Sequence, residues 1–510
     1  MKRTTTPSFV LELPLVVTPG DERILASRFE TARWLYNAVL GEGLKRQRLM
    51  RESRKWRDAL SIADRKERTP ALRSICMKYG FTGASLSSFG TECKNVAGWQ
   101  DLLGAHETQK VSERAFGALE QYGFGKRGKP RFKGKNRPLH SIEGKSNAAG
   151  IRWKSTTQML EWNGLHLAVK TAPAGKDPLQ ESALERVTKY SRIVWRNQKG
   201  IRRWYVQLVQ AGSSPRKDSN YTAPGMVVGL DVGPSTVAVV AREDTALVSF
   251  CPTVDQPWQE MRRLQRRLDR SRRATNPGCF NPDGTWKKGK RQQVFSSRYR
   301  ATRKELAEVE RKLASERKRS HGELANDIIS HGNIVQTERL SYRAFQKMYG
   351  RSVKRRAPSM FITLLKRKAE SAGGELTVLP TEKLKMSHYD HPTETYTKKH
   401  LSCRWHVLGD GSGIVQRDIY SAFLARCVVS NQHHPTTIAE MWSDQEPVLR
   451  RTGWLCNQPA SGNASAEPTV TPSERVVRQR RPAIDYSPDA VAAMREPGRT
   501  DGFVFGTPCL

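Results

Sequence analysis

Three acidic side chains, Asp231, Glu338 and Asp418, each stand at the end of an apolar strand or at the start of a helix, in segments about a hundred residues apart. The sequence "MVVGLDVGPSTVAVV" around Asp231 predicts two buried strands joined by a tight turn. Glu338 ends the short apolar strand "GNIVQTE", and Asp418 opens a helix in "QRDIYSAFLA". An unpaired carboxylate at the mouth of a sheet costs on the order of several kcal/mol unless a metal ion, a hydrogen-bond donor or solvent compensates it. Because strand ends and helix starts of distant segments can meet at one edge of a sheet, the three acids could share one site.

Three carboxylates at one place suit a hard cation such as Mg²⁺. Two magnesium ions about 4 Å apart can hydrolyse a phosphodiester, one by lowering the pKa of the attacking water and the other by stabilising the leaving oxygen. Two families use this kind of strand and turn. RuvC-type nucleases of the RNase H-like fold put the Asp on magnesium, whereas actin-like ATPases put it beside a nucleotide phosphate. Taken alone, each of the three acids is more often a turn cap, a helix cap or a surface residue.

The charge of the chain favours a polyanionic partner. Its 510 residues include 87 Lys and Arg against 50 Asp and Glu, a formal net charge of +37. Such a chain repels itself unless a polyanion neutralises it, and it binds phosphate backbones strongly and in a salt-dependent way. An actin-like protein explains neither this charge nor the basic helices, and its phosphate and adenosine loops have only weak matches in "GDGSG" and "AGGEL".

The location of the protein is predicted from what its sequence lacks. No apolar run approaches the roughly 18 residues that span a membrane, and "MKRTTTPSFVLELPLVV" lacks a secretory cleavage pattern. The cysteines form no Cys-x-x-Cys pair, as expected of reduced thiols. We therefore expect a cytoplasmic prokaryotic protein, associated with the nucleoid when bound to its target, with no membrane partner.

The elements that position the acids alternate between helical and β-rich stretches. Apolar residues at helical spacing among arginines predict a basic helical region, short alternating stretches such as "LHLAVK" and "RWYVQLVQ" predict a barrel-like module, and a later Arg-rich pair of helices predicts a basic hairpin. In that hairpin Met261, Leu264 and Leu268 mark the apolar stripe. A solvated hairpin is the plain alternative, but the scarcity of acids on its face favours polyphosphate contact.

At these motifs the sequence resembles a known family. The order "VVGLDVG", "IVQTERL" and "QRDIYSAFLA" resembles the three RuvC motifs of the TnpB family, the transposon-encoded relatives of compact type V CRISPR effectors. The resemblance extends to "ARWLYNAVL" and "GKPRFKG" and covers roughly residues 8 to 430. It implies a multidomain α+β protein with an N-terminal wedge β-barrel, an inserted helical recognition region, and a C-terminal RNase H-like (RuvC) α/β domain. The expected divisions are the first barrel strand at 1–19, recognition helices at 20–125, the barrel at 126–224, the nuclease domain at 225–430 with the basic hairpin at 255–330, and a mostly disordered tail at 431–510.

The resemblance also implies a function. The chain would be an RNA-guided, magnesium-dependent DNA endonuclease that binds a guide RNA and double-stranded target DNA, with Asp231, Glu338 and Asp418 as ligands of two Mg²⁺ ions. It would leave a 5′-phosphate and a 3′-hydroxyl, and act as a monomer or a homodimer. An RNA-guided binding protein that represses transcription without cutting is the main alternative, and a guide-independent junction resolvase is a third.

Nucleic-acid contacts are expected in three places. A flanking DNA motif would be read near "ARWLYNAVL", where Tyr and Asn can contact base edges or phosphates, although ordinary helix packing explains these residues equally well. In "KPRFKGK" the cations would clamp the backbone while the ring packs or stacks on a base, unless the loop is only solvated. The candidates are Arg33, Tyr36, Asn37, Arg131, Phe132, Lys133 and, in the hairpin, Arg262 and Arg266.

One departure from the family concerns residues 381–413, where most members carry a zinc ribbon with two Cys-x-x-Cys pairs. Here the segment offers only His388, His391, Cys403 and His406. A residual His/Cys zinc site is conceivable from the spacings, but a metal-free degenerate loop that keeps Arg404 beside the acids is the expectation, so zinc is not expected. Loss of zinc would affect the rigidity of this target-loading segment and the cleavage rate, not the three acids.

Overall fold

The computed structural model describes residues 6–134, 137–215, 223–255, 257–289, 292–400 and 403–457. These residues form two compact units, one within residues 6–215 and the other within residues 223–457, so the division falls next to the predicted barrel–nuclease boundary at residue 224. Both units mix helices and strands, as the α+β expectation requires. No helix in the described ranges is long and apolar enough to cross a membrane.

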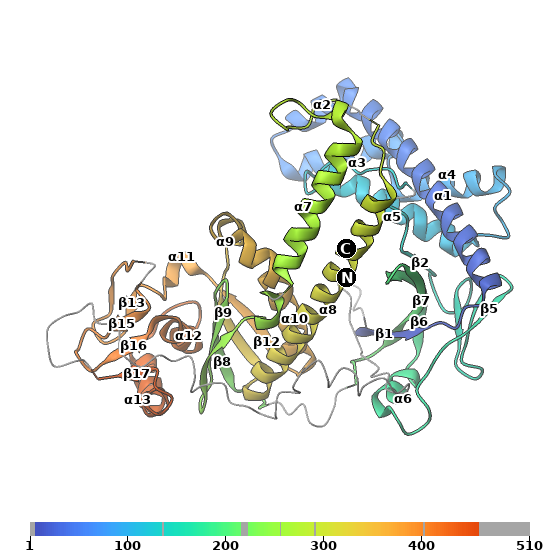
Figure 1. Ribbon diagram of the computed structural model, residues 1–510. Coiled ribbons are helices and arrows are strands. Elements are labelled where there is room, and N and C mark those ends of the chain that lie inside the picture. Colours follow the sequence, from blue (N-terminus) through green and yellow to red (C-terminus); the bar gives the residue numbers. More distant parts are fainter. Residues whose placement is uncertain are drawn as a thin grey trace. The chain divides into compact units, whose positions relative to one another are not determined.

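The helical part of the first unit follows directly on its first strand (Figure 1). Its longest helix starts with a capping box. The Thr18 hydroxyl accepts a hydrogen bond from the Asp21 amide, and the Asp21 carboxylate accepts one from the Thr18 amide. Pro19 lies in the first turn. The buried face of this helix packs on the fourth and fifth helices. The helices are α1 (Pro19–Glu52), α2 (Arg54–Ser61), α3 (Arg65–Lys78), α4 (Gly83–Val96), α5 (Ala105–Gly123) and, among the later strands, α6 (Pro178–Leu184). The predicted helical region is confirmed, whereas α6 was not predicted.

The strands of the first unit form two antiparallel sheets. One sheet has the order β1-β7-β6-β2 and the other the order β3-β4-β5, and a bridge between Leu15 and Val169 joins them. The first strand pairs along its whole length with the last one, from Ser8 opposite Ala211 to Pro14 opposite Tyr205, as predicted for a strand that returns to the β-rich module. The bounds are β1 (Ser8–Pro14), β2 (Ser141–Glu143), β3 (Arg152–Lys154), β4 (Met159–Trp162), β5 (Leu165–Ala168), β6 (Thr188–Gln198) and β7 (Ile201–Ala211).

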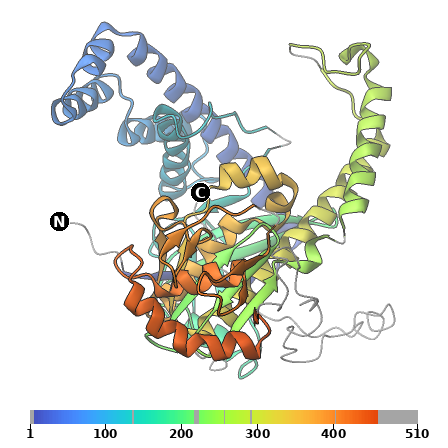
Figure 2. The ribbon, with the colours of Figure 1, turned by 90° about the vertical axis from the view of Figure 1, so that its left-hand side faces the viewer.

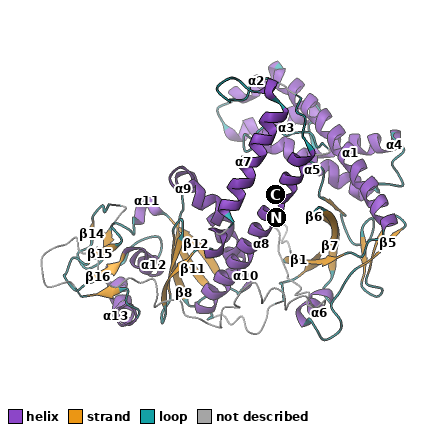
Figure 3. Ribbon diagram, viewed as in Figure 1, coloured by secondary structure: helices purple, strands orange, loops and turns teal. Residues whose placement is uncertain are grey.

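The second unit is built on a five-stranded mixed sheet of order β10-β9-β8-β11-β12 (Figure 3). The strands β8, β11 and β12 are parallel, and β9 and β10 are antiparallel to their neighbours. The strands predicted around Asp231 and before Glu338 are therefore confirmed, and the structure places them in one sheet. The bounds are β8 (Val227–Val232), β9 (Thr236–Val240), β10 (Thr245–Ser249), β11 (Ile334–Glu338) and β12 (Glu375–Leu379).

Helices cover both faces of this sheet. Alternate residues of β8 and β9 point to opposite faces, so that Val228 and Leu230 join a core with α8 and α10, while Ala238 and Val240 join a core with α12 and α13. The basic pair α7 and α8 lies side by side as a long arm (Figure 2), with the predicted Met261 and Leu264 buried. The helices are α7 (Trp258–Thr275), α8 (Ser297–His331), α9 (Tyr342–Arg356), α10 (Pro358–Ser371), α11 (Thr381–Leu384), α12 (Arg417–Cys427) and α13 (Pro435–Arg451).

The prediction of a disordered tail from residue 431 is wrong for residues 435–456. Helix α13 buries Ile438, Trp442 and Leu449, a helical apolar stripe whose spacing the sequence analysis overlooked, and the strand β17 (Leu455–Cys456) pairs with β16 (Ile414–Gln416). Both elements complete the second unit because they cover α12. The remainder of the predicted tail, residues 458–510, lies outside the described residues.

Candidate functional site

The sheet brings Asp231 and Glu338 next to each other. In the parallel strands β8 and β11, Leu230 lies opposite Thr337. Asp231 is the residue after Leu230, and Glu338 is the residue after Thr337. Parallel strands in register point corresponding side chains to the same face, so both carboxylates lie at the carboxyl ends of adjacent strands. This arrangement is the one that the sequence pattern predicted for these two acids.

Helix α12 brings Asp418 to the same edge. The helix packs on β8 at Gly229, where a Cβ atom would lie only 1.9 Å from the carbonyl oxygen of Ala422, so only glycine allows this approach. Asp418 lies in the first turn of α12, and Gln416 caps that turn by accepting the Ile419 amide at 2.7 Å. The positive end of the helix dipole favours a carboxylate at this position.

The three acids lie close enough to influence one another electrostatically. Burial, then the negative charges of Asp418 and Glu338, raise the pKa of Asp231 well above its ordinary value, while Arg417 lowers it. Burial also raises the pKa of Glu338, against a weak hydrogen bond from the Met386 amide at 3.4 Å. Among the described residues no hydrogen bond or ion pair compensates the Asp231 carboxylate. An added cation would therefore stabilise this edge strongly.

Two arginines accompany the third acid. The guanidinium of Arg404, expected near the acids, has Nη1 3.9 Å from Asp418 Oδ2 and is mostly exposed. Arg417, which the sequence analysis missed, lies closer, with Nη2 3.4 Å from Asp418 Oδ1, and is largely buried. Its position beside Asp418 in the motif was the only available signal. Together the two cations compensate Asp418 and offer donors to a phosphate beside it.

The donor chemistry of this edge fits a hard divalent cation, because its three acids supply only carboxylate oxygens. Their positions do not yet form a coordination shell. Among the described residues, no group of three or more His, Cys, Asp and Glu side chains could hold a metal ion as they lie. Metal binding would thus require the three carboxylates to close in on one another.

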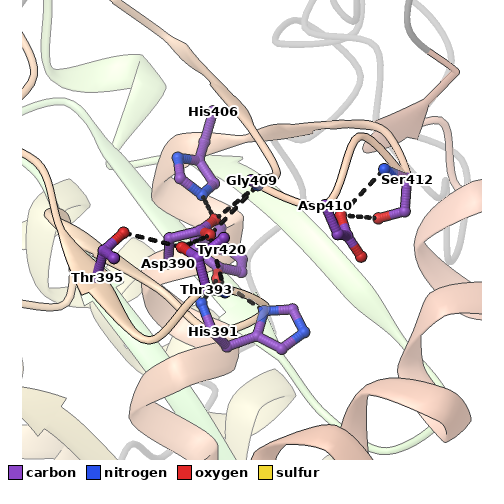
Figure 4. Close-up of polar contacts among 9 residues, drawn as sticks. All are labelled: Asp390, His391, Thr393, Thr395, His406, Gly409, Asp410, Ser412 and Tyr420. Atoms are coloured by element: carbon purple, nitrogen blue, oxygen red, sulfur yellow. Dashed lines mark hydrogen bonds and ion pairs between the residues drawn. The ribbon is translucent and has the colours of Figure 1, made fainter.

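Hydrogen bonds organise the segment 381–413, for which the sequence predicts a degenerate, metal-free loop (Figure 4). The buried carboxylate of Asp390 contacts His406 Nε2 at 2.8 Å, the Thr393 hydroxyl at 2.6 Å and the Gly409 amide at 3.2 Å. His391 Nδ1 lies 2.8 Å from the hydroxyl of Tyr420, and burial lowers the pKa of His391 to about 4.

The remaining two candidate zinc ligands do not join these histidines. Cys403 is exposed, and burial with nearby lysines lowers the pKa of the half-buried His388. The structure therefore does not bring His388, His391, Cys403 and His406 together as a metal site. The short strands of this segment are β13 (Tyr389–Asp390), β14 (Thr395–Tyr396) and β15 (Trp405–Val407).

In the first unit, two predicted nucleic-acid motifs contact each other. The side chain of Asn37 pairs with both backbone groups of Lys133 at 2.8 Å, and Arg33 Nη1 donates to the Lys133 carbonyl at 2.9 Å while its other nitrogens pair with Glu30. Tyr36 is buried, and the Lys133 ammonium lies over its ring. Arg33, Tyr36 and Asn37 thus position the 131–133 loop.

The side chains of that loop are more accessible than those that hold it. Arg131 is exposed, Phe132 is 55% exposed, and Lys133 is half-buried. In the second unit Arg262 and Arg266 are exposed on α7, and Arg262 lies over the Trp258 ring. The expectation that these five side chains contact nucleic acid therefore stays a prediction.

Comparison with known proteins gave matches only at the level of structure. No protein-family model matches the sequence, and no curated protein is significantly similar to it. A cryo-EM structure of a Cas12f1–sgRNA–target DNA complex matches with a TM-score of 0.45 and 13% identity, over 80% of this chain and 82% of that chain. A cryo-EM structure of a CRISPR–Cas12f ternary complex matches with a TM-score of 0.30 and 13% identity, over 81% of this chain and 83% of that chain. With TM-scores below 0.5, neither likeness establishes an activity for this chain.

Proposed function

We propose that this chain is an RNA-guided DNA endonuclease of the TnpB and compact type V class, with a single RuvC-type site. The convergence of Asp231, Glu338 and Asp418 at one sheet edge is the observation that carries the proposal. The order of these acids within RuvC-like motifs and the formal net charge of +37 support it. Nucleic acid is the polyanion that such a charge attracts.

Asp231, Glu338 and Asp418 would hold two Mg²⁺ ions. The ions, when bound, would activate water and stabilise the oxygen that leaves the scissile phosphate. Burial raises the pKa values of Asp231 and Glu338, so these carboxyls hold a proton more readily than exposed ones, and cation binding would oppose that tendency. Arg404 and Arg417 would turn from Asp418 to the phosphate as the carboxylate takes up metal. Zinc has no role in this proposal.

The basic surfaces would hold the guide and the target. Arg262 and Arg266, on the exposed face of α7, would contact the phosphates of the guide or of the RNA–DNA heteroduplex, while base pairing reads the sequence. Arg131 and Lys133 would clamp a backbone and Phe132 would stack on a base near the flanking DNA motif, in a loop that Arg33 and Asn37 hold in place.

An RNA-guided binding protein that represses without cutting is the second candidate, and two observations favour it. The third acid is already paired with two arginines, and the three carboxylates do not lie close enough to form a metal shell. If closing the shell is too costly, the chain would bind its target and leave it uncut. Neither candidate depends on whether the protein acts as a monomer or a homodimer.

The test is whether RNA directs the protein. We would sequence the RNA that copurifies with the full-length chain, replace its guide portion, and incubate the complex with plasmids in magnesium. The proposal predicts that cutting follows the new guide, so that only the newly matched plasmid is linearised. Tight binding to the matched plasmid without cutting would support the repressor, and equal behaviour towards both plasmids would refute RNA guidance.

A further inference from the structure

Both arms of the basic hairpin, α7 and α8, contact the C-terminal turn of α9. On α8, Arg317 Nη1 donates to the carbonyl of Arg355 at 2.9 Å, and His321 Nε2 donates to the carbonyl of Arg356 at 2.8 Å. These are carbonyls at a helix end, which lack partners within the helix. From α7, the Trp258 ring lies under the guanidinium of Arg355, at 4.0 Å. The hairpin is thus fastened to the end of α9 at three points.

The same turn of α9 holds the loop that follows Asp231. Ser352 donates to the carbonyl of Pro234, three residues after Asp231, and accepts from Arg356 Nη1 at 2.8 Å. Arg356 Nε donates to the carbonyl of Phe250 at 2.7 Å, and the Phe250 amide donates to the carbonyl of Ser235 at 2.8 Å. Hydrogen bonds from this turn of α9 therefore hold two consecutive carbonyls of the β8–β9 turn. Ser352 holds the Pro234 carbonyl directly, and Arg356 holds the Ser235 carbonyl through the backbone of Phe250.

The connection between hairpin and turn is buried. His321 is fully buried, its ring stacked on Phe250 with centroids 5.2 Å apart, and Arg356 is 8% exposed. Burial lowers the pKa of His321 to about 4, so the imidazole is neutral near pH 7. Its single N–H proton is then on Nε2, which donates a hydrogen bond to the backbone carbonyl of Arg356. Polar groups buried in this way are costly to separate, so the network favours one arrangement.

We propose that the end of α9 is a positioning link, through which the basic hairpin sets the turn after Asp231. His321, Arg356 and Ser352 are its positioning residues, each acting through hydrogen bonds and none touching DNA. The proposal rests on the function proposed above and deepens it, because the link matters where α7 and α8 hold nucleic acid and Asp231 acts on it. Nucleic acid that immobilises the hairpin would then also restrain the acidic edge of the sheet.

Hydrogen exchange of the full-length protein tests the link without any cleavage. The probe is the segment 229–236, measured with and without an RNA–DNA heteroduplex of about 20 base pairs. We expect the heteroduplex to slow exchange in this segment at least about fivefold in the wild type, the lower end of typical coupling between sites. In Ser352→Ala, which loses the contact to Pro234, the slowing should fall below about twofold at unchanged heteroduplex affinity. Ser443→Ala, on an exposed part of α13, is the matched control and should behave as the wild type.

A pair of substitutions at His321 separates positioning from stability. In His321→Gln the side-chain amide can still donate a hydrogen bond to the Arg356 carbonyl. In His321→Leu the side chain fills much of the same space but has no hydrogen-bond donor. We expect Gln to retain the coupling and Leu to lose it, with both variants folded at the assay temperature. Equal slowing in the wild type, Ser352→Ala and His321→Leu would overturn the link, and so would a wild type whose segment 229–236 ignores the heteroduplex.

The outcomes also distinguish this link from the proposed function. A wild type that shows the coupling but cuts no DNA would refute the nuclease and leave the link standing. If the wild type and Ser352→Ala both cut DNA under RNA guidance but show the same hydrogen exchange in segment 229–236, the nuclease would stand and the link would be refuted.

Discussion

Gly229 tests how Asp418 is positioned, because it is the residue of β8 on which α12 rests. In Gly229→Ala the new Cβ would lie 1.9 Å from the Ala422 carbonyl oxygen and 2.6 Å from the Arg426 amide nitrogen. Both are backbone atoms, so no side-chain rotation can relieve the contact. To restore an ordinary contact of 3.4 Å to the Ala422 oxygen from the present 1.9 Å, α12 must retreat by about 1.5 Å. The helix would carry Asp418 with it.

This displacement has two measurable effects. Overpacking of this kind costs about 1–3 kcal/mol, and backbone neighbours place Gly229→Ala at the upper end, which urea unfolding monitored by circular dichroism would measure. A misplacement of about 1 Å at a reacting centre costs about 10²-fold in rate, so guided cleavage should fall by at least that factor while heteroduplex affinity is retained. The loss of activity should exceed the fraction of protein that is unfolded in the assay.

Gly322→Ala is the matched control for this substitution. Gly322 lies within α8, and a Cβ atom there would meet nothing within 4 Å. Helix propensity predicts that this change stabilises the protein by up to about 1 kcal/mol and leaves cleavage unchanged. If Gly229→Ala were as stable and active as Gly322→Ala, the close packing of α12 on β8 would not be what positions Asp418.

Three further predictions concern other parts of the chain. Glu107 is fully buried, and burial raises the pKa of its carboxyl although nearby backbone amides and His106 act to lower it, so wild-type stability should fall as pH rises through that raised value. Glu107→Gln should remove this loss, giving a urea midpoint above the wild type at pH 7 and an advantage that shrinks towards pH 4; an advantage independent of pH would contradict the reasoning. In His406→Leu the buried carboxylate of Asp390 keeps donors only from Thr393 and Gly409, which should cost about 1–3 kcal/mol in urea unfolding, whereas a zinc chelator should leave the wild-type midpoint unchanged; a midpoint lowered by the chelator would restore the zinc hypothesis. Phe132→Ala should weaken binding of single-stranded nucleic acid by about 1–3 kcal/mol in fluorescence anisotropy, with protein stability unchanged within about 0.5 kcal/mol; unaltered affinity would assign Phe132 to packing.

The acidic edge was predictable because its signals are local. A Val-rich run that ends in an acid predicts a buried strand wherever it occurs, so β8 and β11 and the positions of Asp231 and Glu338 followed from the sequence. The apolar spacing after Asp418 predicts α12, which places Asp418 in the first turn of that helix. The resemblance to a family supplied the order of the three motifs, which no single strand could reveal.

The rest depended on contacts between distant segments. The apolar stripe of α13 is hard to recognise in the sequence because polar residues and Pro447 interrupt it, and the sequence does not show its packing against α12 and β17. The pairing of Asn37 with the Lys133 backbone joins residues almost a hundred positions apart, so the sequence alone presents the helix and the loop as separate nucleic-acid contacts. The close approach of α12 to Gly229 was equally hidden, because glycine in a strand indicates close approach without naming the partner.

The most direct test of the central claim is magnesium-dependent cleavage of a guide-matched plasmid by the three acid variants. Asp231→Asn, Glu338→Gln and Asp418→Asn nearly preserve side-chain size but remove the anionic ligand, and Glu440→Gln, exposed on α13, is the matched control. The account predicts that the wild type and Glu440→Gln cut the plasmid, leaving 5′-phosphate ends, while each acid variant binds it equally well and cuts at least about a hundredfold more slowly. Cutting by the three variants at the wild-type rate would contradict the assignment of the acids.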